Sequence, residues 1–263
     1  MTEDEHPWLY LQRDQPVGVP ALALTGERTL PDVPEENYWF RRHLAVYDWI
    51  AARVGGLRVI DMACGEGYGS DVLARTAASV VGVDANPEAF EHARLRYRRE
   101  NLRFERDMVS RFGEACDVVV FLQTIEHVED PDDVLEHFKA LIGVRGVVYL
   151  STPNVLTLAP SGAPRSGNPW HVHEYRATEI RALCAEHFRD VTLLGLFHAR
   201  KLRLHELALR HARWDDIHAR LGITKRFYDR FVPAISARDF VLRSAEEGAD
   251  LDRALDLVAE CRP

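Results

Sequence analysis

Long apolar runs and paired cysteines are both missing from this sequence. No stretch approaches the roughly 18 consecutive apolar residues of a membrane-spanning helix, and residues 1–5 are acidic where a signal peptide is cationic. The cysteines stand apart without any C-x-x-C spacing, which argues against a zinc knuckle and provides no disulfide framework. We therefore expect a cytoplasmic protein that has no membrane partner.

Basic residues are also fewer than acidic ones. The chain of 263 residues has 33 Lys and Arg against 41 Asp and Glu, which gives a formal net charge of -8. Because this charge repels a phosphate backbone, we expect no nucleic acid partner. The hydrophobic content of 46% and the length together fit one α/β core with insertions.

From residue 57 onward, strand-like and helix-like segments alternate. Apolar runs predict strands at 57–63, 79–83, 102–105, 117–122 and 146–150. Helical patterns lie between them at 68–78, 88–99 and 131–142. Strands and helices in this order indicate parallel pairing with right-handed crossovers.

The pattern continues to the end of the chain. A helix that Thr178 caps runs to Phe188, a strand covers 191–197, and a terminal strand begins at Leu255. We therefore predict an α/β fold with a Rossmann-like, doubly wound and mostly parallel sheet of seven strands.

The remaining segments differ in composition from this core. Residues 1–36 are rich in Pro, Gly and charge and predict an N-terminal arm; residues 37–198 and 239–263 form the core domain. Residues 199–238 predict a helical insertion that acts as a lid or as a homodimer element. Its many Arg and His residues indicate either a solvated helix face or a surface for an anionic acceptor.

The segment from Asp61 to Gly69 joins the first predicted strand to the first helix through small residues. Small residues let a ligand approach the backbone at the carboxyl edge of the sheet, where doubly wound folds bind nucleotides. Asp84, at the end of the second strand, is placed to accept hydrogen bonds from the hydroxyl groups of a ribose. Asp107, after the third strand, suits an adenine amino group.

A dinucleotide-binding dehydrogenase is the alternative interpretation of this loop. Its fingerprint is G-x-G-x-x-G, whereas this chain has G-x-G-x-G followed by Ser70. The fingerprint serves to bind a diphosphate at a helix N-terminus, and the acidic Glu66 inside the loop disfavours phosphate. The loop therefore favours a nucleoside cofactor that carries no phosphate.

Over residues 57–154 the chain resembles the class I S-adenosylmethionine (SAM)-dependent methyltransferases. The glycine loop resembles the first motif of that family, Val81-Gly-Val-Asp84 its ribose-binding motif and Asp107-Met108 its adenine contact. Gln123-Thr-Ile-Glu-His127 and Leu150-Ser-Thr-Pro-Asn154 resemble the ends of its fourth and fifth strands. One departure is Ala63, where the family usually has glycine.

The resemblance implies that SAM is the cofactor. The residues that would bind it are Tyr38, Arg42, Ala63, Gly65, Glu66, Gly67, Asp84, Ala85, Asp107, Met108 and Gln123. Within this set, Tyr38 or an arginine beside it would meet the carboxylate of SAM, or else the aromatic residues of that segment only pack.

A narrower resemblance lies outside the core motifs. Segments 24–31, 36–43 and 168–171, together with the terminal Leu255-Asp-Leu-Val, resemble mycobacterial methyltransferases of polymethylated polysaccharide synthesis. This implies a hydroxyl of a small saccharide or glycosyl acid as the methyl acceptor. The alternatives are a quinone, lipid or other small molecule as acceptor, or a SAM-binding protein without catalysis.

Three histidines are candidates for the base that removes the proton of an acceptor hydroxyl. His127 follows the fourth strand, and His171 and His173 lie in the loop after the fifth, where open α/β sheets bind their ligands. Each could instead only order its loop.

A metal ion is the alternative to a base. Glu126, His127, Glu129 and Asp130 could bind Mg²⁺, which would acidify the hydroxyl. The acidic residues from Glu129 to Asp133 are otherwise explained as the solvated N-terminus of the next helix.

Overall fold

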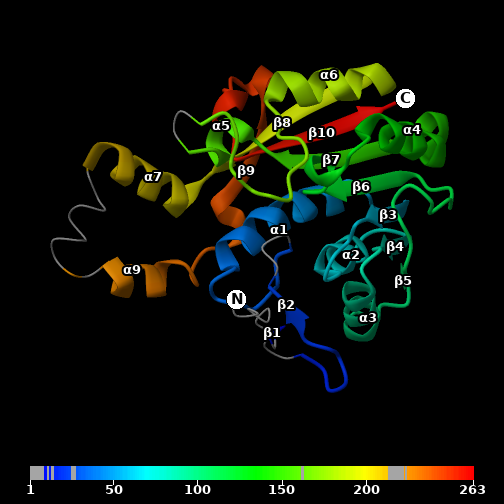
Figure 1. Cartoon of the computed structure of the whole chain (residues 1–263), viewed down its shortest axis with the longest axis horizontal. Helices are drawn as coiled ribbons and strands as arrows, with labels where there is room; N and C mark the ends of the chain where they lie inside the picture. The colour runs from blue at the N-terminus through cyan, green and yellow to red at the C-terminus, as the bar shows by residue number, and fades with distance from the viewer. Residues whose placement is uncertain are drawn as a thin grey trace, which may run out of the picture.

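The computed structural model describes residues 9–10, 12, 15–24, 28–160, 163–212, 222 and 224–263. Its centre is a sheet of eight strands in the order β5-β4-β3-β6-β7-β10-β8-β9 (Figure 1). The strands are β3 (Arg58–Met62), β4 (Ser79–Val83), β5 (Leu102–Glu105), β6 (Val118–Leu122), β7 (Val147–Pro153), β8 (Asp190–His198), β9 (Phe240–Ser244) and β10 (Asp256–Arg262).

The sheet is mostly parallel, as the sequence predicts. Strands β3 to β7 pair in parallel, whereas β10 is antiparallel to both β7 and β8. Parallel pairing brings the ends of β3, β4 and β6 to the same edge of the sheet, with the loops that follow them. The arrangement is a Rossmann-like, doubly wound α/β fold.

The predicted number of seven strands is wrong by one. The eighth strand is β9, which pairs antiparallel with the outer edge of β8 from Leu194↔Ser244 to His198↔Phe240. Most of its residues are only half-buried, so its apolar pattern is weaker than that of the central strands. An edge strand with one neighbour needs no continuous apolar run.

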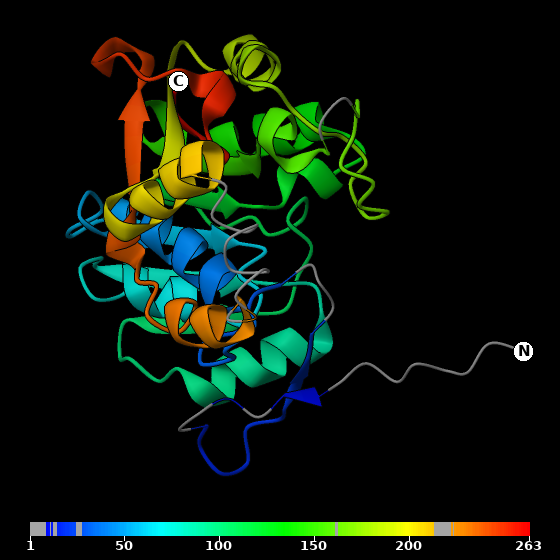
Figure 2. The same cartoon turned by 90° about the vertical axis from the view of Figure 1, so that its left-hand side faces the viewer.

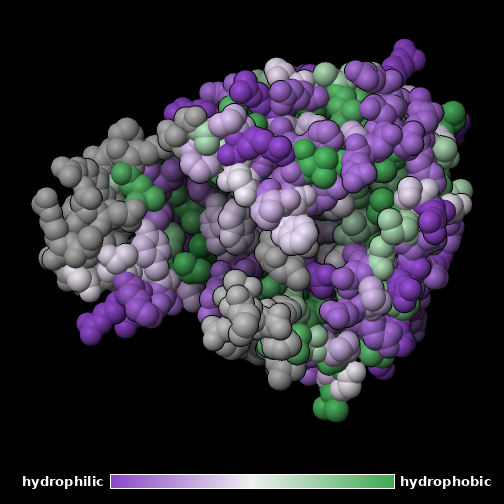
Figure 3. All heavy atoms as spheres, viewed as in Figure 1, coloured by the Kyte–Doolittle hydropathy of each residue, from purple (hydrophilic) through white to green (hydrophobic). Residues whose placement is uncertain are grey.

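Helices cover both faces of the sheet. One face carries α1 (Asn37–Ala51), α2 (Tyr68–Leu73) and α3 (Pro87–Arg96), and the other carries α4 (Pro131–Ile142) and α6 (Ala177–His187) (Figure 1). Each set of helices buries its own apolar cluster against the strands. The outer surface over α4 and α6 is largely hydrophilic in Figure 3, with scattered apolar residues.

Local N-caps set where the helices begin, and some of these starts differ from the predicted ones. Asn86 caps α3 by accepting hydrogen bonds from the backbone of Glu88 and Ala89, and α4 begins at Pro131 as predicted. Thr178, the predicted cap of α6, lies inside that helix; Arg176 occupies the N-cap, and the Glu179 carboxylate accepts from its backbone N–H at 2.8 Å. The reciprocal bond from Glu179 therefore fixes the helix start.

The described part of the N-terminal segment packs on the core. Strands β1 (Leu9–Tyr10) and β2 (Leu22–Ala23) form a small antiparallel sheet, and Leu22, Leu30 and Val33 make a buried apolar cluster. This segment's contacts with the domain include a hydrogen bond from Gln12 Nε2 to Glu66 at 2.9 Å and one between Pro20 O and His92 Nδ1 at 2.7 Å.

The described part of the segment 199–238 includes the helices α7 (Arg200–Ala212) and α9 (Thr224–Phe231), drawn yellow and orange in Figure 2. The ring of His205 on α7 stacks with Phe227 and contacts Phe231 on α9. Residues 213–221, which include part of the predicted basic stretch, lie outside the described residues. The role of this segment as a lid or homodimer element remains a prediction.

Candidate functional site

Two adjoining cavities open at the carboxyl edge of the sheet. The first, of about 280 Å³, follows β3 and β4 and is lined by Ala63 to Glu66 and by Asp84; we call it the glycine-loop cavity. The second, of about 490 Å³, is lined by Glu126, His127 and His171 among others; we call it the histidine cavity. Both are lined by Arg28, Thr29, His43, Gln123 and His127.

Asp84 is held at the end of β4 by two backbone groups. Its Oδ2 accepts a hydrogen bond from Gly65 N at 2.8 Å, and its Oδ1 accepts from Asn86 N at 2.8 Å. Each carboxylate oxygen can accept a further hydrogen bond. Asp84 is therefore fixed in the cavity wall with acceptor capacity for two ligand hydroxyls.

The loop after β3 depends on unusual backbone angles. Ala63 and Gly65 have φ of 55° and 57°, in the left-handed region that favours glycine. An alanine there costs about 1–2 kcal/mol, so the departure of Ala63 from the family pattern is accommodated at a modest cost. A side chain at Gly69, in the first turn of α2, would lie 2.1 Å from Cζ of Tyr47.

Asp61 supports this loop from below. It is fully buried and accepts hydrogen bonds from Ser70 Oγ at 2.6 Å and from Tyr47 Oη at 3.2 Å. Burial raises the pKa of Asp61 to about 7, although both hydrogen bonds lower it. Asp61 thus connects β3, α1 and α2 beneath the cavity.

Glu66 lines the glycine-loop cavity, and its carboxylate is hydrogen-bonded to protein partners, so its contact with a cofactor remains a prediction. It accepts hydrogen bonds from Gln12 Nε2 at 2.9 Å, from Tyr97 Oη at 2.8 Å and from Tyr68 N at 3.0 Å, and lies 3.1 Å from His92 Nε2. Glu66 therefore ties the N-terminal segment to the glycine loop.

Tyr38 and Arg42 line neither cavity, and their contact with the cofactor remains a prediction. The hydroxyl of Tyr38 pairs with His198 Nε2 at 2.8 Å. Arg42 is buried and donates to both carboxylate oxygens of Asp256 and to Leu255 O. Because of the helix period, the neighbouring Trp39 and His43 are the α1 residues that line the histidine cavity.

The predicted adenine contacts lie outside the cavity walls. Asp107 and Met108 follow β5, and Asp107 Oδ1 accepts from Met108 N at 2.8 Å; neither residue, nor Ala85, lines the glycine-loop cavity. Gly67 also lies beside it, where a side chain would come 2.8 Å from Ala93 Cβ. Their contact with a cofactor remains a prediction.

Gln123 and His127 lie on the wall that the two cavities share. Gln123 has a φ of 52°, and its side chain donates to Ser151 Oγ at 2.9 Å. Non-glycine residues in the left-handed region are uncommon and occur often at functional sites. His127 Nδ1 lies 2.9 Å from Trp170 O; because a carbonyl only accepts, Nδ1 carries the proton and Nε2 is left as the basic atom.

His171 is oriented in the same way from the other side. Its Nδ1 lies 2.9 Å from the Glu174 carboxylate, and its Nε2 lies 3.0 Å from Nδ2 of Asn168. Oδ1 of Asn168 accepts from Trp170 N, so its Nδ2 is the group that donates to His171. His171 is therefore protonated at Nδ1 and presents a lone pair at Nε2.

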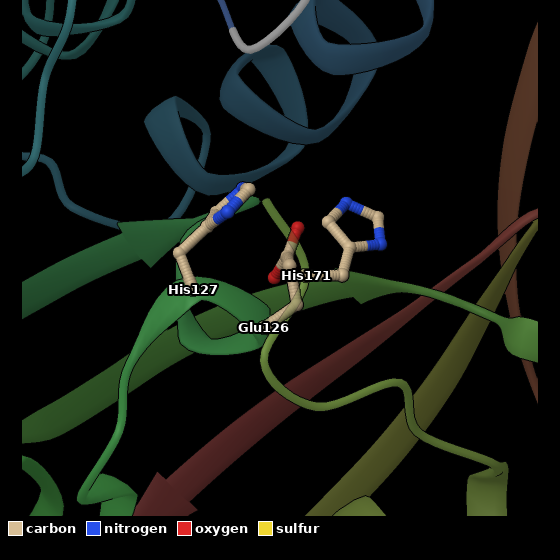
Figure 4. Close-up of side chains that lie close together, drawn as sticks. All are labelled: Glu126, His127 and His171. Atoms are coloured by element: carbon tan, nitrogen blue, oxygen red, sulfur yellow. The ribbon is translucent and has the colours of Figure 1, made fainter. Parts of the chain in front are cut away.

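Glu126 lies between the two imidazole rings (Figure 4). It is 2% exposed, and its Oε2 has no hydrogen-bond partner among the described residues. Burial raises the pKa of Glu126 to about 8. We call Glu126, His127 and His171 the Glu–His cluster; one ligand atom of each lies within 4.8 Å of the others.

The other predicted residues of this region lie apart from the cluster. Glu129 and Asp130, in the predicted Mg²⁺ set, are outside it, and Asp130 instead caps α4 by accepting from Asp133 N at 3.2 Å. His173 lines neither cavity, and its backbone N–H donates to Glu126 O. Of the three predicted histidines, the structure brings His127 and His171 together.

Sequence reasoning missed Arg28, Thr29 and His43, which line both cavities. Thr29 Oγ1 lies 3.1 Å from the hydroxyl of Tyr68, which fixes the N-terminal segment over the loop. Burial lowers the pKa of His43 to about 4, so its ring is neutral at physiological pH. The signal was present, because the segments 24–31 and 36–43 carry the narrower resemblance.

A doubly wound sheet with a glycine loop, an acidic residue after β4 and a cavity between them defines an α/β enzyme with a nucleoside-bearing cofactor. The chain belongs to the methyltransferase-domain family, whose profile matches residues 34–207. It is therefore a SAM-dependent methyltransferase.

Relatives and solved structures agree with this assignment. A probable SAM-dependent methyltransferase of Mycolicibacterium smegmatis is 38% identical over 247 residues, covering 91% of this chain and 94% of the relative. A ubiquinone biosynthesis O-methyltransferase of Actinobacillus pleuropneumoniae is 32% identical over 120 residues, or 41% of this chain and 51% of the relative.

A solved SAM-dependent methyltransferase of Thermotoga maritima, described as a possible histamine N-methyltransferase, shares the fold with a TM-score of 0.57 and 13% identity. The match covers 87% of this chain and 94% of that chain.

Among the described residues, no helix combines the length and apolarity that crossing a membrane requires.

Proposed function

We propose that this enzyme methylates a hydroxyl group of a sugar or glycosyl acid, with SAM in the glycine-loop cavity and the acceptor in the histidine cavity. The observation that carries the proposal is the common wall of the two cavities, which includes Gln123 and His127. Methyl transfer is an in-line displacement that depends on close alignment of donor and acceptor. Adjoining cavities favour that alignment.

The glycine-loop cavity fits SAM through the chemistry of its donors and acceptors. Asp84 offers a carboxylate with free acceptor capacity to the two ribose hydroxyls. Arg28 lines the same cavity and takes the role that the sequence assigned to Tyr38 or Arg42, the contact with the methionyl carboxylate. Asp107 and Met108 complete the site at the adenine end.

The lining of the histidine cavity supports a polyhydroxylated acceptor. Glu36, Ser166 and Asn168 provide polar atoms, and the half-exposed ring of Trp39 provides a flat apolar surface. A sugar pairs its hydroxyls with such polar groups and its C–H face with such a ring. Trp170, whose carbonyl contacts His127, lies outside the lining.

The chemistry divides between the cofactor and the chain. SAM, when bound, supplies a methyl group on a sulfonium, and the electrons of the breaking C–S bond stay on sulfur as the C–O bond forms. The chain positions the hydroxyl and assists loss of its proton, a contribution worth about 10²- to 10⁴-fold in rate. We assign this assistance to the Glu–His cluster, which faces the acceptor side.

We also propose a cytoplasmic location and a role for residues 199–238 as a lid or homodimer element. The proposal for this segment is supported by α7 and α9, which pack on each other through the rings of His205, Phe227 and Phe231 and lie outside the central sheet.

The test is transfer of labelled methyl from SAM to a panel of mono- and disaccharides, glycosyl-glycerates, quinones and catechols. We expect label in a saccharide or a glycosyl-glycerate. His127→Ala should lower turnover by about 10²-fold or more while SAM affinity is retained. Label confined to quinones or catechols would overturn the acceptor assignment and leave the methyltransferase assignment intact.

A further inference from the structure

The Glu–His cluster has the donor set of a transition-metal site. Two imidazoles and one carboxylate suit Zn²⁺, Fe²⁺ and similar ions, whereas Mg²⁺ prefers oxygen ligands only. Figure 4 shows the three side chains from the turn after β6 and from the loop at His171, all reaching toward one space. Their ligand atoms lie within 4.8 Å of one another.

Both imidazoles are oriented as metal-bound histidines are. A ligating histidine usually donates its second ring N–H to a carbonyl or carboxylate, which leaves the other nitrogen for the metal. His127 Nδ1 lies 2.9 Å from Trp170 O, and His171 Nδ1 lies 2.9 Å from the Glu174 carboxylate. The Nε2 atoms of both rings are thus the unprotonated ones.

The carboxylate of Glu126, between the two imidazoles, has a buried oxygen without a hydrogen-bond partner among the described residues. That oxygen is Oε2, and Glu126 as a whole is 2% exposed. A buried polar oxygen without a partner costs about 1–3 kcal/mol. A cation bound at this oxygen would remove that cost, which a purely structural role for Glu126 leaves unexplained.

The three side chains must move slightly closer together to coordinate one ion. Ligand atoms about 2.1 Å from a tetrahedral ion are separated by about 3.4 Å, so the side chains must approach by rotation. Asn168 Nδ2, which lies 3.0 Å from His171 Nε2, must also turn away. Because the cluster lines the histidine cavity, a fourth coordination position would face an acceptor.

We propose that Glu126, His127 and His171 bind one divalent transition-metal ion of the Zn²⁺ class, which coordinates the acceptor hydroxyl. This rests on the proposed function, since it specifies how that hydroxyl is activated. A hydroxyl bound to such an ion loses its proton to solvent more easily, as metal-bound water does. The resulting oxygen keeps the electron pair that forms the bond to the methyl carbon.

The test uses the full chain, freed of metal by chelation and titrated with Co²⁺ as a spectroscopic substitute for Zn²⁺. We expect one equivalent of Co²⁺ to produce a visible d–d absorption band that Zn²⁺ abolishes and Mg²⁺ does not. His171→Ala should eliminate the band. Glu174→Gln, which leaves all three ligands in place, should weaken Co²⁺ binding by about 10- to 100-fold.

The matched control is Glu129→Gln, an exposed acidic residue outside the cluster, which should bind Co²⁺ as the unaltered chain does. Equal Co²⁺ spectra for the unaltered chain and His171→Ala, or the absence of any band, would overturn the metal site. Full saccharide methylation by metal-free enzyme would overturn the metal's role while the proposed function stands. A cluster-dependent band with label confined to quinones would instead refute the acceptor and leave the site.

Discussion

Asp61 makes stability depend on pH through one buried carboxyl. Burial raises its pKa from 3.8 to about 7, so the folded chain binds a proton that the unfolded chain releases between those values. The contribution of Asp61 to stability is therefore present at low pH and is lost as pH rises toward 7.

Asp61→Asn should remove this dependence, because an amide does not titrate and can still pair with Tyr47 and Ser70. Between pH 5.5 and 7, the unfolding free energy of the unaltered chain should fall relative to the variant by about 1–2 kcal/mol, since one pKa unit is worth about 1.4 kcal/mol. Urea denaturation of both proteins at several pH values measures the difference. Parallel pH profiles would contradict this role for Asp61.

Gly69 is required by the ring that lies against it. A Cβ at this position would lie 2.1 Å from Cζ of the buried Tyr47, whereas Gly55 has no atom within 4 Å of such a Cβ. Gly69→Ala should therefore cost roughly 1–3 kcal/mol of stability. Gly55→Ala should change stability by less than about 0.5 kcal/mol. Thermal unfolding compares the pair, and equal stabilities would show that Tyr47 moves freely.

At this scale, three predicted site residues, Asp84, His127 and Glu66, line the cavities, whereas Arg42 lines neither. Asp84 directly follows β4 and His127 lies in the turn after β6, so strand ends fix their position. The orientations of Glu66 and Arg42 depend instead on distant partners, Tyr97 and Asp256, which no local pattern reveals.

Helix α1 and strand β10 are joined by a buried ion pair at opposite ends of the sequence. Arg42 donates to both oxygens of Asp256, and neither side chain is more than 5% exposed. Removing one partner of a buried pair leaves an uncompensated charge and typically costs 3–5 kcal/mol.

Arg42→Ala should therefore destabilise the chain by about 3–5 kcal/mol. Arg41→Ala is the control, since Arg41 hydrogen-bonds to Asn37 within α1 and, among the described residues, to no other element; it should cost less than about 1 kcal/mol. Denaturant unfolding followed by circular dichroism gives both values. A loss below 1 kcal/mol in Arg42→Ala would mean that water or another group replaces the guanidinium.

Among the elements, central strands were predictable and peripheral ones were not. Every residue of β6 is buried, and its continuous apolar run is visible in the sequence. Strand β9 alternates less clearly because its edge position leaves residues half-buried. Strands β1 and β2 have two residues each, too few for any period to show.

For the whole molecule, the arrangement of segments decides the site. The N-terminal segment brings Arg28 and Thr29 to cavities whose other walls come from the strand ends and α1. Composition predicted an N-terminal arm but not where it packs on the domain. That position depends on the hydrogen bonds of Thr29 with Tyr68 and of Gln12 with Glu66. The cofactor site is thus built from parts of the chain that are far apart in sequence.

The central claim is that SAM binds at the carboxyl edge with Asp84 holding the ribose. The most direct test is calorimetry of SAM binding to the unaltered chain, to Asp84→Ala and to Asp117→Ala. Asp117 is a matched carboxylate, since it pairs with Arg58 where β6 begins, at the opposite edge of the sheet. We predict a loss of about 10- to 100-fold in affinity for Asp84→Ala, because hydrogen bonds to a charged group are worth about 1.5–3 kcal/mol, and no loss for Asp117→Ala. Undiminished SAM binding by Asp84→Ala would contradict the account.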